Sequence, residues 1–155
     1  MEILGVTAFD MLNLDAKAFS RNSDKNREVK ALLIENQPDV LYLPSLFDNH
    51  QEHRILNILA GHALKQVPSK RITARGYEIW SPLPATVLLD ISEVIEQKQQ
   101  AIRCYSSQLE NVRYDHHITG LNAYRAMTLE NKGLYAEAFL EMPAADYVEL
   151  IEKYL

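Results

Sequence analysis

Two histidines and two carboxylates crowd into one short polar segment of the chain, Asp48-Asn49-His50-Gln51-Glu52-His53. Histidines at positions i and i+3 near a helix start can both place their imidazoles on one side of that helix. Neutral imidazole is a common zinc ligand, and a carboxylate such as Asp48 or Glu52 can orient it through a hydrogen bond. The segment therefore has residue types that suit metal-assisted chemistry, although two histidines alone do not make a zinc site.

The same spacing has a simpler interpretation. Asp48 can cap a helix whose first turn carries both histidines as solvated polar residues. From spacing alone this interpretation is favoured, because a bare His-x-x-His pair is a weak motif. Position supports the metal-site interpretation, since the segment follows the apolar run Val40–Leu43, and open α/β folds place their chemistry at the carboxyl ends of strands.

The other histidines give weaker signals. His116 and His117 are adjacent, so on a helix their side chains point about 100° apart and do not readily bind one ion. We interpret them as a polar helix start. His62 lies on the opposite side of its helix from His53, because nine residues turn the helix by about 900°. We therefore expect His62 to be unrelated to the candidate site.

The sequence lacks the motifs of several other enzyme classes. It contains neither a Gly-x-Ser-x-Gly nucleophile elbow nor a glycine-rich phosphate loop. Cys104 lies in a predicted helical stripe and is interpreted as a small buried residue. Tyr77 and Trp80 can line a pocket, but an aromatic strand that packs in the core is the favoured interpretation.

The elements that would hold the candidate site follow from periodicity and from helix caps. Ser23 or Asp24 can cap a first helix. The continuous apolar run Val40–Leu43, bounded by Pro38 and Pro44, predicts a strand that is buried on both faces. The short run 134–142 is ambiguous between strand and loop. The sequence predicts either one or two short strands within 2–12 or a helix end followed by a strand there. It further predicts helices at 25–36, 51–66, 91–109, 114–130 and 143–155, and strands at 40–43, 71–80 and 86–89.

Length and composition favour one globular domain spanning 1–155. The chain has 155 residues, of which 47% are hydrophobic and 24% charged, and its net charge is −5. This acidic balance argues against nucleic acid as a partner. A single cysteine forms no internal disulfide, and no apolar run approaches the ~20 residues of a membrane span. The expected location is the cytoplasm.

A family resemblance appears when the flanking motifs are taken in order. These are Ile3-Leu4-Gly5-Val6, Gln37-Pro38-Asp39-Val40-Leu41-Tyr42-Leu43-Pro44, Asp48-x-His50-x-Glu52-His53-Arg54, Tyr77-Glu78-Ile79-Trp80-Ser81-Pro82-Leu83, Asp90-Ile91-Ser92 and Tyr135-Ala136-Glu137-Ala138-Phe139. Together they resemble the PIG-L/LmbE family of zinc-dependent N-acetylglucosaminyl deacetylases. The resemblance runs along most of the chain.

The resemblance implies a fold and a set of roles. The expected fold class is α/β: an incomplete Rossmann-like, LmbE-like three-layer fold with a mostly parallel sheet whose N-terminal strands are missing. By resemblance, His53 would be the zinc ligand and His50 the catalytic residue that polarises the amide carbonyl. Asp48 and Glu52 would be supporting or substrate-pocket residues. The family usually has Asp where Glu52 stands, so the role of Glu52 is open.

One family motif is missing from this sequence. The family's remaining zinc ligands, a His and an Asp, and its general-base Asp come from an Ala-His-Pro-Asp-Asp-Glu-type motif, which does not occur here. We therefore expect the chain to be the C-terminal portion of such a deacetylase, inactive alone. An N-acetylated sugar conjugate is the possible substrate, and a complementing N-terminal segment or a second copy is the possible partner.

Two alternatives remain open. The chain can be a non-catalytic binding or assembly module derived from the same fold. It can also be an unrelated α/β domain with a chance likeness. The sequence leaves the exact substrate and the oligomeric state undecided.

Overall fold

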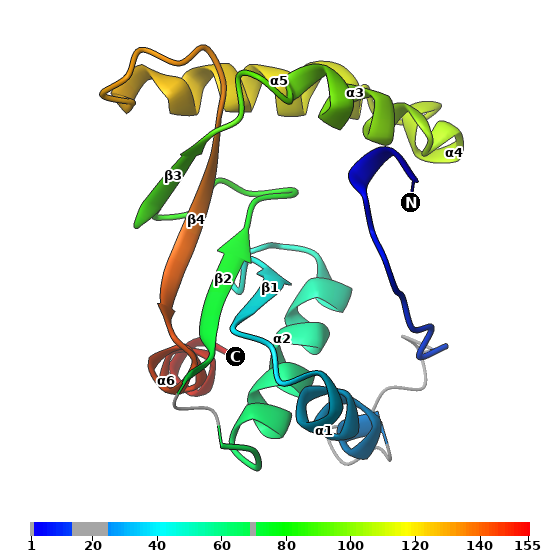
Figure 1. Ribbon diagram of the computed structural model, residues 1–155, viewed down its shortest axis with the longest axis vertical. Helices are drawn as coiled ribbons and strands as arrows, with labels where there is room; N and C mark the ends of the chain where they lie inside the picture. Colours follow the sequence, from blue (N-terminus) through cyan, green and yellow to red (C-terminus); the bar gives the residue numbers. More distant parts are fainter. Residues whose placement is uncertain (1, 14–24, 69–70) are drawn as a thin grey trace. The chain divides into compact units, whose positions relative to one another are not determined.

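The computed structural model describes residues 2–13, 25–68 and 71–155 (Figure 1). By its internal contacts the chain divides into two compact units. The first unit comprises Met1–Asp10 and Val87–Ala138, and the second comprises Met11–Thr86 and Phe139–Leu155. The organisation as one domain stays a prediction, and the expected helix caps Ser23 and Asp24 lie outside the described residues.

The described strands form a four-stranded sheet in the order β1-β2-β4-β3. β1 and β2 pair in parallel, with Val40 opposite Thr73, whereas β2 and β4 pair antiparallel, with Thr73 opposite Pro143. The predicted α/β class is confirmed, and the sheet is mixed. The strands are β1 (Val40–Pro44), β2 (Thr73–Tyr77), β3 (Val87–Asp90) and β4 (Ala136–Pro143).

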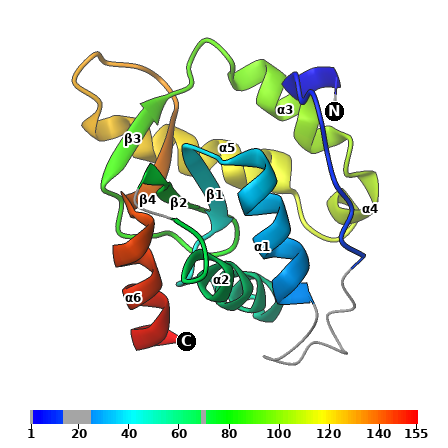
Figure 2. The ribbon, with the colours of Figure 1, turned by 60° about the horizontal axis from the view of Figure 1, so that its bottom comes forward.

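Three helices belong to the second unit. The predicted bounds 25–36 match those of α1, and α2 begins where the sequence placed it. Figure 2 shows α2 between α1 and α6, and α2 contacts both of them. The helices are α1 (Lys25–Asn36), α2 (Gln51–Leu64) and α6 (Ala144–Tyr154).

One face of the second unit's strands packs against α2 and α6. Leu43 of β1, Ala74 of β2 and Leu140 of β4 share a buried cluster with Ala60 of α2 and Tyr147 of α6. The periodicity of two along each strand sends alternate side chains to this face. The core therefore fixes how α2 lies against the end of β1, which is where the candidate site begins.

The opposite face of β1 does not match the prediction of a strand buried on both sides. The Tyr42 side chain is 49% exposed, and its hydroxyl accepts a hydrogen bond from Nη1 of Arg75 at 2.7 Å. Arg75 also forms an ion pair with Glu141. The buried Phe139 ring also packs against Tyr42 here, with ring centroids 5.7 Å apart, so this face of β1 is only partly covered.

The first unit departs further from the sequence predictions. The single helix expected at 91–109 is two helices, separated at Cys104 and Tyr105, and Cys104 is exposed rather than buried. The strands expected within 2–12 are absent from 2–12, where the only regular element is a short 3-10 helix. The elements are η1 (Glu2–Leu4), α3 (Ile95–Arg103), α4 (Ser106–Leu109), α5 (Tyr114–Arg125) and η3 (Ala126–Thr128). No described helix has both the length and the apolar character needed to cross a membrane.

Candidate functional site

Asp48 is the buried centre of the candidate site. A tight turn follows β1, in which the Asp48 amide donates to the Ser45 carbonyl at 3.0 Å. The Asp48 side chain is fully buried. Its Oδ1 accepts from the His50 amide at 2.9 Å, and its Oδ2 accepts from the Trp80 amide at 3.0 Å. One carboxylate therefore ties the loop after β1 to the loop after β2.

His53 faces this carboxylate from the first turn of α2. Its Nδ1 lies 3.3 Å from Oδ2 of Asp48, while the side chain is 20% exposed. The two side chains are therefore in contact, but the geometry is not that of a hydrogen bond, and Nδ1 is buried with no hydrogen-bond partner among the described residues. The contact orients the imidazole without satisfying its ring nitrogen.

His50 lies directly against His53. It occupies the N-cap position of α2 with extended backbone angles, φ −76° and ψ 124°. The two imidazole centroids are 4.6 Å apart and the ring planes differ by 35°. Nδ1 of His50 is also buried without a hydrogen-bond partner in the described part of the chain. The structure thus brings Asp48, His50 and His53 together, whereas Glu52 is exposed on the same helical turn.

The prediction that Trp80 packs in the core as part of a strand is wrong. β2 ends at Tyr77, and Trp80 lies in the loop that follows, with 50% of its surface exposed. Its ring stacks on His50 with a centroid distance of 6.2 Å and an interplanar angle of 12°. Because β1 and β2 are parallel neighbours, the loops that follow them meet at one edge of the sheet. A parallel pairing of the strands at 40–43 and 71–80 would have placed Trp80 at the site, but no local pattern in the sequence indicates that pairing.

A buried polar pair behind the histidines was missed by the sequence analysis. Asn57, fully buried on α2, donates from Nδ2 to the carbonyls of Pro44 at 2.8 Å and His53 at 2.9 Å. The Tyr147 hydroxyl of α6 donates to Oδ1 of Asn57 at 2.8 Å. Burial raises the pKa of this hydroxyl well above its ordinary value. An asparagine within the apolar stripe of α2 was the signal for this network.

The donor set does not by itself fit the predicted zinc ion. A catalytic zinc site takes three protein ligands and an open position. Within 2–13, 25–68 and 71–155, no group of three or more His, Cys, Asp or Glu is arranged to hold a metal ion. Both oxygens of Asp48 already accept backbone N–H groups. The cluster can supply imidazole nitrogens to a metal, but it cannot complete the coordination.

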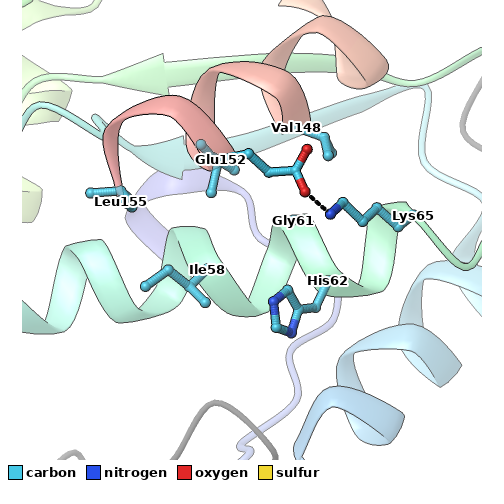
Figure 3. A pocket seen from close by; sticks show the side chains of 8 residues that line it. Ile58, Gly61, His62, Lys65, Val148, Glu152 and Leu155 are labelled. Atoms are coloured by element: carbon cyan, nitrogen blue, oxygen red, sulfur yellow. Dashed lines mark hydrogen bonds and ion pairs between the residues drawn. The ribbon is translucent and has the colours of Figure 1, made fainter.

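The remaining histidines belong to α5 and to the last turn of α2. His116 and His117 are exposed in the first turn of α5, as predicted for a polar helix start. His62 borders a separate hollow of about 250 Å³ between α2 and α6, beside the ion pair of Lys65 with Glu152 (Figure 3). The hollow is lined by Ile58, Gly61, His62, Lys65, Val148, Ile151, Glu152 and Leu155.

No protein-family model matches the sequence, and no curated protein matches it. Among solved structures, the conserved protein TT1542 from Thermus thermophilus is similar, with a TM-score of 0.78 and 21% identity over 92% of this chain and 69% of that one. GalB, the 4-carboxy-2-hydroxymuconate hydratase from Pseudomonas putida, is also similar, with a TM-score of 0.72 and 20% identity. The match covers 91% of this chain and 67% of that one.

A third similar structure is the N,N'-diacetylchitobiose deacetylase from Pyrococcus horikoshii in complex with its inhibitor MPG. Its TM-score is 0.74 at 21% identity, over 94% of this chain and 61% of that one. At this level of identity the likeness concerns the fold. The chain therefore has an α/β fold that resembles LmbE-like structures and is shared by a deacetylase and a hydratase.

Proposed function

We propose that Asp48, His50 and His53 form one side of a hydrolase site that removes the acetyl group from an N-acetylated sugar conjugate. The observation that carries the proposal is a pair of buried imidazole nitrogens beside a buried carboxylate, neither of which has a hydrogen-bond partner among the residues that the structure describes. Buried polar atoms are nearly always hydrogen-bonded, so two neighbouring ring nitrogens that lack partners indicate that a ligand or a metal ion binds to the cluster. The fold likeness to a chitobiose deacetylase supports amide hydrolysis as the reaction.

The proposed roles follow from the chemistry of amide cleavage. Water adds its oxygen to the acetyl carbon, the C–N bond breaks, and the nitrogen leaves as an amine that has gained a proton. The products are acetate and the free amino sugar. Negative charge develops on the carbonyl oxygen during attack, and His50 is the proposed donor to it. Asp48 holds His53 in place, and Glu52 is the proposed substrate-pocket residue.

A completing segment is part of the proposal. In hydrolases of this kind zinc supplies a Lewis acid and activates water, and His53 is the residue here that would contact it. The described residues do not complete that site, so we propose that a segment bearing a histidine and paired aspartates supplies the other ligands and the base. The similar solved structures are longer, since this chain covers 61–69% of them. The finer fold assignment, an incomplete three-layer Rossmann-like domain, belongs to the same proposal.

A second candidate function is a non-catalytic binding or assembly module. The observation that favours it is the lack of a three-ligand group in the described ranges. Such a module would bind its ligand at the same cluster without turnover. The free, exposed Cys104 suits a reducing compartment under either candidate, and we propose the cytoplasm.

Complementation tests the proposed function. Zinc content and release of acetate from N,N'-diacetylchitobiose are measured for the chain alone and after addition of a segment carrying a His-Pro-Asp-Asp motif. We expect neither bound zinc nor activity for the chain alone, and both after complementation. A complemented protein without activity supports the binding module instead. Activity of the chain alone would overturn the assignment of the base to another segment.

Substitutions then test the named residues. In the complemented protein, His50→Ala and His53→Ala are expected to lower activity by at least about a hundredfold, in the range seen for loss of one oxyanion donor. His116→Ala is the matched control, because His116 is exposed on α5. If the control lowers activity as much as the two site variants, the site assignment is wrong.

A further inference from the structure

The position of Trp80 relative to the cluster is fixed by a shared acceptor. Oδ2 of Asp48 accepts the Trp80 amide, and Oδ1 of the same carboxylate accepts the His50 amide. The Asp48 side chain is fully buried, so the accepting oxygens of both bonds are shielded from water. Trp80 is therefore held next to His50 by backbone contacts that do not depend on the indole itself.

The indole remains half exposed although it is the largest apolar side chain near the cluster. Its exposed fraction is 50%, while its ring is nearly parallel to the His50 imidazole. Aromatic side chains contribute most when they are buried, so the exposed half of the indole surface is free of that contribution and can receive a ligand. Ligand sites commonly pair such aromatic surfaces with a few convergent polar groups.

We propose that Trp80 is the platform on which the ring of the ligand lies while its acetamido carbonyl reaches His50. The ligand class is a pyranose that bears an acetamido group. One face of such a ring presents C–H groups, which pack against the negative face of an indole. An acyclic N-acetyl compound has no such face. The inference rests on the proposed function, since it assumes that His50 receives the carbonyl, and it adds the residue that selects the ring.

The chain carries its own reporter for this contact. Trp80 is its only tryptophan, so the indole fluorescence of the protein comes from this position alone. The unaltered chain is titrated with N,N'-diacetylchitobiose, with N-acetylethanolamine and with glucose. The first carries both ring and acetamido group, the second lacks the ring, and the third lacks the acetamido group. We expect a saturable change in emission with N,N'-diacetylchitobiose and at least about tenfold weaker binding of the other two.

Variants separate stacking from folding. Binding of N,N'-diacetylchitobiose is measured by calorimetry for Trp80→Ala and Trp80→Phe. Loss of the platform in Trp80→Ala is expected to weaken binding about tenfold or more, whereas Trp80→Phe keeps an aromatic face and retains most of it. Tyr124→Ala is the control, because Tyr124 is 66% exposed on α5 in the other unit. Unchanged binding in Trp80→Ala, or equal binding of the acyclic compound, would overturn the proposal.

The outcome is distinguishable from failure of the proposed function. Should the complemented protein release no acetate while N,N'-diacetylchitobiose still binds through Trp80, the platform stands and the hydrolase assignment fails. If the complemented protein releases acetate equally well with Trp80→Ala and with an unchanged KM, the hydrolase assignment stands and the platform is wrong. No saturable change in emission and no heat of binding with the unaltered chain would also overturn the platform.

Discussion

The Tyr147 hydroxyl donates a hydrogen bond of 2.8 Å to Oδ1 of Asn57, and both side chains are fully buried. The same asparagine donates to the carbonyls of Pro44 and His53. It thus joins the end of β1, the first turn of α2 and the helix α6. The backbone that carries His53 is held by this network rather than by the imidazole itself.

Asn57→Ala is expected to destabilise the fold. It removes both donors, and it leaves the Tyr147 hydroxyl without its acceptor and the Pro44 carbonyl without this donor. An unsatisfied buried group costs about 1–3 kcal/mol, so the free energy of unfolding should fall by at least that amount in urea titrations. Asn36→Ala is the matched control, because Asn36 also donates to a carbonyl four residues earlier, at 2.9 Å, but is exposed. Its effect should stay within about 0.5 kcal/mol. Equal effects of both changes would contradict the role of the buried network.

Tyr147 should make the fold sensitive to alkali. Burial raises the pKa of its hydroxyl above the ordinary value of 10.0, so the folded state retains a proton that the unfolded chain releases. The stability gained from this group is present in full below pH 10 and is lost as the pH rises toward the pKa of the folded state. We expect the stability difference between the native chain and Tyr147→Phe to be constant from pH 7 to 9 and to shrink above pH 10. A difference that is independent of pH up to 11 would contradict the shift.

Gly76 lies where a side chain would disturb the same network. A Cβ atom there would lie 3.3 Å from the Tyr147 hydroxyl oxygen and 3.6 Å from the Ser45 Cα. Gly76→Ala is therefore expected to lower the free energy of unfolding by about 1–3 kcal/mol, as overpacked cores do. Gly120, within α5, would place a Cβ with no described heavy atom inside 4 Å, so Gly120→Ala should stabilise by up to about 1 kcal/mol. Thermal unfolding measures the stability of both variants. If Gly76→Ala stabilises the protein, a Cβ at this position is not crowded by Tyr147 and Ser45.

Asp48→Ala is expected to separate Trp80 from His50. The change removes the acceptor of the two amides and leaves both N–H groups unsatisfied, at about 1–3 kcal/mol each. The emission of Trp80 should change because its ring no longer stacks on the imidazole. Asp39→Ala, at an exposed position before β1, is the control and should alter neither emission nor stability. Unchanged emission in Asp48→Ala would show that the stacking does not depend on this carboxylate.

The sequence predicted best where local signals were strong. Prolines on both sides of Val40–Leu43 and a polar break before α2 bounded both elements, and the structure places β1 and α2 within a residue or two of those limits. The clustering of Asp48, His50 and His53 also agrees with their spacing. Short-range periodicity is a property of the segment itself, so it survives into the fold.

Contacts between distant segments were not predictable in the same way. Trp80 belongs to the site because β2 is the parallel neighbour of β1, and that pairing is not encoded near Trp80. Cys104 is exposed and follows the last residue of α3, Arg103. No Gly or Pro near this position predicts the end of the helix. The stretch 134–142 was ambiguous because its alternation is partial, and pairing with β2 makes it a strand. In each case tertiary packing decided what local propensity left open.

β1 pairs on one side only within the described residues, so its other row of peptide groups is available to another chain. The same row would accept either a second copy of this chain or the strand of a completing segment. Self-assembly and completion would then compete for one edge. At a fixed concentration of the completing segment, dilution of this chain would favour completion of the site. A high concentration of this chain would favour pairing of β1 between two copies and would leave the site incomplete.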